Sequence, residues 1–523
     1  MIAEIGLSDA NDQGITVTEI AAMNRPIAVN THTTAAFVGR ALRGPLNTPV
    51  LIESVKAFER RFGGSWHRSH LGPAVKLFFE HGGMKLYIVR VANNARGAML
   101  ALPASGGVLV LHALEPGATE RIRAAVDFDG IDPADEEHFN LVVQRVSPES
   151  GLVQDQEIFS RVSCNNEDRK FVGRALLNSH MVRVQTPLPS GRPIATLKDG
   201  AAFEAGYVEV TQRGSDGSAL SDYDLIGSAE HDSGLFALNQ IEHFELLYLP
   251  PPAASGDLGP IATLAAEQYC RSRGAMLVMD PLSSWDTVEK AVDGVRNCGY
   301  TSSHMVSYYP RILKRNETDG VARVAGGAIA GLLCKLDRLH GPWEDLDQLG
   351  SGIARHLKPA QEISIDEAHL LVRAGLNVIA GKSAGRSAVC GSVTLGGGSQ
   401  LDRKFSSLTV RRLCLKITNA IDRATQWAVF EQNGSQIAER ILGQVDGYMS
   451  HLANSGAFDG NRFVVQCETG LFGKATDPDR GVTILLAFRP AGTDEDIALT
   501  LHQTIAGCRV AATAFAPVSA EVA

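Results

Sequence analysis

One glycine-rich stretch, LNVIAGKSAGRS, holds the residues whose types and spacing are best suited to chemistry. Gly381, Ser383 and Gly385 match G-x-S-x-G, the pattern of a hydrolase nucleophile elbow, in which a sharp turn exposes the serine hydroxyl. Gly375, Lys382 and the same serine also come close to a phosphate-binding loop, whose backbone N–H groups hold phosphate oxygens. The stretch therefore raises two enzymatic hypotheses that both use Ser383: an α/β hydrolase and a nucleotide-dependent enzyme.

The secondary structure predicted around Ser383 fits neither a nucleophile elbow nor a phosphate-binding loop. An elbow places its serine between a strand and a helix, because the N-terminus of that helix faces the oxyanion. The residues after Ser383, AGRSAVCGSVTLGGG, have no helical periodicity and predict a second strand. A phosphate loop has four residues between its first glycine and the Gly-Lys-Ser, whereas Gly375 and Gly381 enclose five. We therefore interpret the stretch as a hairpin joining 376–380 to 387–393, keep the Ser383 enzyme as the alternative, and expect no cofactor.

The sequence contains no clear metal-binding motif. His67 and His70 form an isolated H-x-x-H, but no cluster of Cys, Asp or Glu accompanies them. The eight cysteines include no C-x-x-C pair, so neither a zinc ribbon nor a thioredoxin-like site is indicated. We expect no metal site.

Composition and charge exclude several broad classes. A chain of 523 residues should bury more than one core, and its 44% hydrophobic and 20% charged residues are typical of a globular protein. A net charge of −9 argues against a nucleic-acid partner. The longest apolar run, 321–334, contains Arg323 and is shorter than the roughly 20 residues of a membrane span, so none is expected. The first residues also lack the basic and apolar regions of a secretory signal.

The hydrophobic patterns predict a multidomain fold of the α+β and α/β classes. Short strands separated by Gly, Pro, Asp and Ser clusters indicate an inserted β-sandwich, and a β-α-β-α-β rhythm after Phe244 indicates a parallel sheet. Two amphipathic helices and a pair of antiparallel strands follow near the end. The predicted divisions are an N-terminal arm (1–24), a first core segment (25–98), the sandwich (99–198), the α/β domain (199–400), a C-terminal α+β domain (401–495) and a terminal strand with its tail (496–523).

Two predicted strands near the chain ends have no evident local partner. Residues 14–20, GITVTEI, and 496–503, DIALTLHQ, alternate as strands do. An isolated strand is unstable in water, and an open strand edge invites pairing with another chain. Exchange of these strands between subunits would satisfy both, which predicts a polymer. The alternative is that both strands fold back onto their own subunit.

The order of these segments resembles contractile-tail sheath proteins of bacteriophages and related injection devices. The resemblance rests on GITVTEI, on TAAFVGRALRGPLNTPVLIESVKAFERRFGG, and above all on SLTVRRLCLKITNAIDRATQWAVFEQN. It covers nearly the whole chain. The device could be a phage tail, a tailocin or an extracellular injection system, while one undivided chain disfavours the type VI secretion arrangement, in which two proteins share the sheath.

The resemblance implies a mechanical function with no enzymatic activity. Subunits of this kind form hexameric rings that stack into a helical sheath around an inner tail tube, with baseplate and tail terminator proteins as further partners. An inner domain built from both chain ends would carry the inserted outer domains. A metastable extended sheath would contract and drive the tube through a target envelope. The expected location is the virion tail, assembled in the host cytoplasm and acting extracellularly.

The resemblance also assigns roles to individual residues. The linking strands would contain Gly14, Ile15, Val17 and Ile20 at one end and Ile497, Leu499 and Leu501 at the other. The sheet that receives them would contain Phe463, Val465, Ile484 and Leu486. Because the assembled particle acts outside cells, where thiols can oxidise, Cys164 and Cys508 are candidates for disulfides between subunits.

Overall fold

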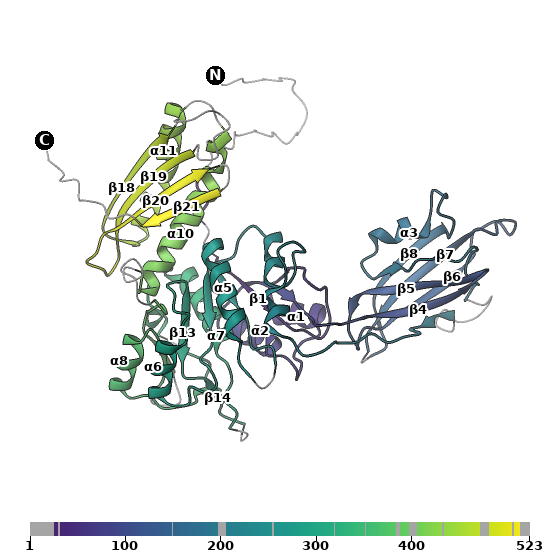
Figure 1. The fold of residues 1–523 in the computed structure, drawn as a ribbon, viewed down its shortest axis with the longest axis horizontal. Coiled ribbons are helices and arrows are strands. Elements are labelled where there is room, and N and C mark those ends of the chain that lie inside the picture. The colour runs from purple at the N-terminus through teal and green to yellow at the C-terminus, as the bar shows by residue number, and fades with distance from the viewer. Residues whose placement is uncertain are drawn as a thin grey trace, which may run out of the picture. The chain divides into compact units, whose positions relative to one another are not determined.

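The structure is a computed structural model. It describes residues 26–29, 32–148, 150–196, 206–253, 256–317, 320–350, 352–382, 387–396, 405–430, 434–470, 481–504 and 507–512. The chain forms two compact units, one of residues Thr31–Arg412 and one of Met1–Asn30 together with Leu413–Ala523. The predicted strand at 14–20 and Ser383 lie outside the described residues. Mixed α/β, multidomain architecture is confirmed, and Figure 1 labels its elements.

An eight-stranded sheet forms the centre of the larger unit, in the order β17-β16-β13-β12-β11-β1-β3-β2. The six inner strands run parallel, and β2 and β17 pair antiparallel at the two edges. Helices on both faces bury these strands, which explains their continuous apolar sequences and confirms the predicted β-α-β-α-β rhythm. The strands are β1 (Thr34–Gly39), β2 (Val50–Ile52), β3 (Lys85–Arg90), β11 (Leu246–Tyr248), β12 (Met276–Met279), β13 (Met305–Tyr309), β16 (Asn377–Gly381) and β17 (Ser387–Cys390).

Two of the helices on this sheet approach each other unusually closely. A Cβ on Gly327 of α7 would lie 2.3 Å from the carbonyl oxygen of Ala74 in α2, and one on Gly331 would lie 2.4 Å from that of Phe78. Only glycine therefore allows this packing. The main helices of the unit are α1 (Val55–Phe62), α2 (Leu71–Glu80), α4 (Asp222–Ile226), α5 (Pro260–Arg273), α6 (Val288–Asn297), α7 (Gly326–Leu339) and α8 (Ile365–Arg373).

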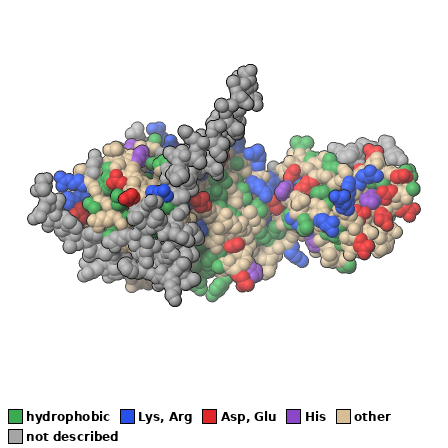
Figure 2. Space-filling model, turned by 90° about the horizontal axis from the view of Figure 1, so that it is seen from above, with side chains coloured by type: hydrophobic (Ala, Val, Ile, Leu, Met, Phe, Trp, Pro, Cys, Tyr) green, Lys and Arg blue, Asp and Glu red, His purple; other side chains and the backbone are tan. Residues whose placement is uncertain are grey.

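A β-sandwich is inserted between β3 and β11 (Figure 1). Its two sheets, β10-β6-β7-β8 and β4-β5-β9, share one hydrophobic core that includes Leu100, Leu111, Phe139 and Val162. On the face drawn in Figure 2, acidic and basic side chains alternate over the sandwich instead of gathering by sign. Its elements are β4 (Gly97–Ala104), β5 (Gly107–Pro116), β6 (Ile122–Asp127), β7 (His138–Val146), β8 (Val153–Ser163), α3 (Val172–Ala175), β9 (Val182–Val184) and β10 (Val208–Glu209), and a separate small hairpin joins β14 (Ile312–Lys314) to β15 (Leu357–Pro359).

The smaller unit packs helices against a four-stranded antiparallel sheet of order β18-β19-β20-β21. The two predicted amphipathic helices are confirmed as α10 (Leu408–Thr425), which begins in the larger unit, and α11 (Gly434–Asn454). Ile441, Val445 and Met449 of α11 are buried, as a stripe of period 3.6 requires. The strands are β18 (Phe458–Gly470), β19 (Gly481–Pro490), β20 (Ile497–Thr504) and β21 (Gly507–Ala512).

The expectation that 496–503 has no partner in its own chain is wrong. β20 pairs antiparallel with β19 on one side and with β21 on the other. The connection from β19 is only six residues long, and Gly492 adopts the left-handed backbone (φ 72°) that such a turn favours. An ion pair between Arg489 and Asp496, 2.9 Å apart, joins its two ends. A tight local hairpin therefore supplies the missing partner.

Candidate functional site

The hairpin predicted around Gly381 is confirmed. β16 and β17 pair antiparallel, with Val378 opposite Cys390 and Gly381 opposite Ser387. Ser383 and Gly385 belong to the connection, which lies outside the described residues. The element after the motif is thus a strand, whereas both enzymatic motifs need a helix there.

The carboxyl edge of the parallel sheet is where α/β proteins bind ligands, at the point where the strand order reverses. Here that point lies between β1 and β11. A Cβ on Gly39, the last residue of β1, would lie 3.3 Å from Pro250 and 3.6 Å from Leu71, so side chains fill this place. A cavity beside it, lined by Asp257, Asp280 and other residues, measures about 10 Å³, which is room for about one water molecule.

The buried acid at this edge has a structural role. Asp280 accepts hydrogen bonds from the Tyr248 hydroxyl, at 2.5 Å, and from the backbone N–H groups of Ala325 and Gly326, at 3.1 and 2.8 Å. These two N–H groups lie at the N-terminus of α7, whose unpaired donors need such a partner. Burial raises the pKa of Asp280, while its hydrogen bonds oppose that rise. The carboxyl group caps α7 and ties it to the sheet.

Other site types also find no support in the described part of the chain. No group of three or more His, Cys, Asp or Glu there has the geometry of a metal site, and His67 and His70 belong to none. No described helix combines the length and apolarity that crossing a membrane requires.

The four-stranded sheet brings the predicted assembly residues together. Val465 of β18 lies opposite Leu486 of β19, which lies opposite Leu499 of β20. The same register aligns Ile484 with Leu501. Residues opposite each other share a face of the sheet, so the predicted receiving and linking residues form one apolar layer. The predicted residues of this layer are Phe463, Val465, Ile484, Leu486, Ile497, Leu499 and Leu501, and Phe488 lies between Phe463 and Ile497.

The two outer strands of this sheet present exposed edges. β18 and β21 each have a partner strand on one side only among the described residues. Val464 of β18 is 53% exposed and Val510 of β21 is 50% exposed. Unpaired N–H and C=O groups along such edges can accept a strand from another chain. Sequence reasoning missed β21, because its sequence GCRVAA is rich in small residues and has little apolar alternation.

A groove runs along α11 in the same unit. Pro26, Ile27 and Val29 form one wall, the helix forms the other, and the groove has a volume of about 550 Å³. Gly443 and Gly447 lie one turn apart on the helix, and a Cβ on either would meet no atom within 4 Å. The described residues Pro26, Ile27 and Val29 therefore lie beside α11.

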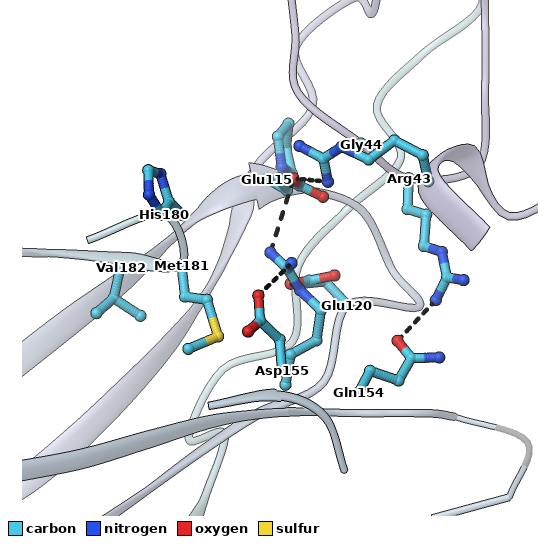
Figure 3. Close-up of polar contacts among 12 residues, drawn as sticks. Arg43, Gly44, Glu115, Glu120, Gln154, Asp155, His180, Met181 and Val182 are labelled. Carbon is cyan, nitrogen blue, oxygen red and sulfur yellow. Dashed lines mark hydrogen bonds and ion pairs between the residues drawn. The ribbon is translucent and has the colours of Figure 1, made fainter. Parts of the chain in front are cut away.

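A polar network joins the sandwich to the rest of the larger unit (Figure 3). Arg61 of α1 contacts Glu115 of β5 at 2.5 Å, and Glu115 lies 3.7 Å from Arg145 of β7. Arg145 also bonds Glu120 at 2.8 Å, and Arg43 donates to Gln154 at 3.2 Å. Burial acts to lower the pKa of Arg145, but its acidic neighbours outweigh burial and raise it, so this guanidinium stays charged.

The two cysteines considered for disulfides differ in what surrounds them. Cys164 lies in the sandwich core, and burial raises the pKa of its thiol to about 11. A buried thiol with little thiolate reacts slowly, which weighs against a link between subunits at Cys164. Cys508 lies on β21 opposite Gln503, and its side chain is outside the described set.

Comparison with solved structures identifies the fold. No protein-family model and no curated protein matches the chain. The sheath tail protein of Listeria innocua superposes with a TM-score of 0.60 at 15% identity, covering 92% of this chain and 97% of that one. The chain has the fold of contractile tail sheath proteins. The sheath tail protein of Desulfitobacterium hafniense shares this sheath fold at 16% identity (TM-score 0.51, coverage 94% and 100%). So does the contracted helical sheath of the anti-feeding prophage, at 14% identity (TM-score 0.52, coverage 94% and 98%).

Because a strand follows the motif where both enzymatic sites need a helix, we predict that Ser383 is dispensable. We expect Ser383→Ala to change the unfolding midpoint by less than about 1 °C, because the substitution removes a single hydroxyl group. Hydrolysis of a p-nitrophenyl ester and of ATP should match a protein-free blank for both the wild type and the variant. Turnover by the wild type that Ser383→Ala abolishes would restore the enzymatic hypothesis.

Proposed function

We propose that this chain is a tail sheath subunit, which polymerises around an inner tube and contracts to drive that tube through a target envelope. The observation that carries the proposal is the sheath fold over 92% of the chain. The open edges of the four-stranded sheet support it, because they offer the main-chain groups through which subunits can link. Genome or effector delivery would be the outcome of contraction.

The N-terminal arm would form one of the links. Its strand, with Gly14, Ile15, Val17 and Ile20, would add to an open edge of a neighbour's sheet. The 25 residues before Pro26 could extend about 80 Å at roughly 3.3 Å per residue, which is enough to reach an adjacent subunit. A strand added to β18 would lie beside Phe463 and Val465.

The C-terminal link needs a different form from the one first expected. β20 is flanked within its own chain by β19 and β21, so neither of its sides is open. We propose that β20 and β21 exchange between subunits as a pair. Ile497, Leu499 and Leu501 would then meet Ile484 and Leu486 of a neighbour in the register that they adopt within one chain.

The remaining partners follow from the same role. Hexameric rings would stack into a helical sheath that encloses a tail tube protein, with baseplate and tail terminator proteins at its two ends. One of α10 and α11 would face the tube. Energy would come from interfaces formed on contraction, so the subunit would need no nucleotide. Assembly would take place in the host cytoplasm, and the finished tail, tailocin or injection system would act outside the cell.

Negative-stain electron microscopy of the purified protein tests the proposal, because a sheath subunit should form sleeves or rings. Proline variants on β18 test the edge. The N–H groups of adjacent strand residues point to opposite sides of the strand. Proline lacks an N–H group, so one of Val464→Pro and Val465→Pro disrupts only the open edge and leaves the hydrogen bonds to β19 intact. We expect that variant to keep the wild-type unfolding midpoint and to form no sleeves.

Ile158→Pro is the matched control, because Ile158 is exposed on β8, an edge strand of the sandwich. Sleeves should survive this substitution, or its neighbour Phe159→Pro, whichever leaves stability unchanged. Normal sleeves from the stable β18 variant would contradict the proposal that the open edge of β18 accepts a strand from another subunit. Absence of any sleeve, ring or oligomer from the wild type under all assembly conditions would contradict the sheath role itself.

A further inference from the structure

The chain passes twice between its two compact units, at residues 30–31 and at residues 412–413. Thr33 lies just after the first passage, one residue before β1 begins. Arg412 is the last residue before the second passage and lies in α10, which continues across it. Both residues belong to the larger unit.

A single carboxylate oxygen in the larger unit accepts hydrogen bonds from both residues. Asp337 lies near the end of α7. Its Oδ2 accepts one hydrogen bond from the Thr33 hydroxyl and another from Nη2 of Arg412, the latter at 2.5 Å. The side chains of Asp337 and Arg412 are each 5% exposed. Segments that are far apart in sequence, and that each lead into the smaller unit, are therefore tied to one buried atom.

The helix that carries Asp337 is a firm support. Gly327 and Gly331 bring its backbone against that of α2, and a shift of the helix would create steric overlap there. Most of α7 is buried, including Ile329 and Leu333. A force applied to Asp337 would thus be shared by α7, α2 and the sheet beneath them.

Neighbouring contacts strengthen both tethered segments. The backbone N–H of Thr34 donates to Glu245 at 2.7 Å, next to Thr33. In the first turn of α10, Arg411 contacts His304 at 2.6 Å. Burial lowers the pKa of His304 to about 3, so its imidazole is neutral at ordinary pH and can accept this hydrogen bond.

Asp337 depends on these two donors. Its Oδ1 is buried and has no hydrogen-bond partner in the described part of the chain. A buried charge that loses one of few partners is strongly penalised, so Thr33 and Arg412 act on Asp337 as a coupled pair.

We propose that Asp337 is a mechanical anchor. Through it, force on the segment around Thr33 and force on α10 are transmitted to the parallel sheet and helices of the larger unit. The proposal rests on the proposed sheath function, in which contraction supplies that force. Because both segments are hydrogen-bonded to Asp337, they stay adjacent under tension, and neither separates from the larger unit alone. Asp337 is thus a positioning residue for contraction.

Hydrogen exchange of the isolated full-length subunit tests the anchor without requiring a polymer. In Asp337→Asn, which keeps the side-chain size but removes the charge, peptides covering 32–40 and 405–420 should both exchange at least about tenfold faster. Thr33→Val removes only one donor and should accelerate 32–40 more than 405–420. If Asp337→Asn fails to fold, this asymmetry in Thr33→Val still decides the question, because equal or unchanged rates in the two segments contradict the anchor.

Glu120→Gln is the matched control, since Glu120 is 2% exposed and pairs with Arg145 in the sandwich. It should leave both segments at wild-type exchange rates. Acceleration of only one segment in Asp337→Asn, or the same acceleration in Glu120→Gln, would overturn the anchor. Wild-type protein that forms no sleeves would instead refute the sheath role and leave the exchange result standing.

Discussion

Removal of residues 1–22 is expected to abolish sleeve formation and to leave the subunit folded. The described elements of both compact units begin at Pro26 or later, so the deletion removes none of their strands, helices or core side chains. We expect the thermal unfolding midpoint to change by less than about 2 °C, since the core side chains of residues 26–512 all remain. Circular dichroism would follow unfolding, and electron microscopy would count sleeves at equal protein concentration.

Sequence-matched controls distinguish the effect of the strand pattern at 14–20 from the effect of having an N-terminal arm of any sequence. Val17→Ile with Ile20→Val keeps the alternation of GITVTEI and should form normal sleeves. A scrambled 14–20 of the same composition should behave as the deletion does. Contraction of the deletion variant at the wild-type frequency would refute the linking role of the arm.

Arg90→Met is expected to destabilise the larger unit strongly. Arg90 ends β3, is almost fully buried, and donates hydrogen bonds to the carbonyl oxygens of Ala41, Leu42, Gly44 and Pro116. Burial lowers its pKa to about 10, so the guanidinium remains charged at neutral pH. Methionine fills similar space but leaves those carbonyls without donors, and we expect the free energy of unfolding to fall by about 3 to 5 kcal/mol.

Urea denaturation measures this effect, with Lys290→Met as the control. Lys290 of α6 pairs with Asp286, and both side chains are 60% exposed. Solvent screens such a pair, so its loss should cost at most about 1 kcal/mol. A loss below about 1 kcal/mol for Arg90→Met would mean that water replaces the guanidinium at these carbonyl oxygens.

Local sequence patterns were sufficient to predict the elements whose stability is local. The apolar strands of the parallel sheet, the two helices α10 and α11, and the hairpin around Gly381 could be found this way, because period and turn residues lie within short windows. The strand β8 could not. Val153 and Ile158 are exposed, and the polar residues between them give no alternation, because β8 is an edge strand with solvent on much of both faces.

Pairing between distant segments was harder to predict. Leu499 and Leu501 were recognised as strand residues, but sequence does not state whether a strand pairs with its own chain or with a neighbour. The roles of Arg90 and Asp337 were missed for a similar reason, because their partners lie far away in sequence. A signal existed for Arg90, since a charged residue inside the apolar run MKLYIVRV must be buried with partners or force the strand to end.

The six-residue connection between β19 and β20 has a consequence for when a polymer can start. In the single chain, β20 and β21 occupy the place that a neighbour's strands would take. Exchange would break and remake the same hydrogen bonds, so it changes bond enthalpy little. A tethered strand competes at an effective concentration in the millimolar range, far above that of free subunits in dilute solution. On the proposed exchange, the strands of the free subunit would inhibit its own assembly, and growth would start where a template gathers subunits at comparable density.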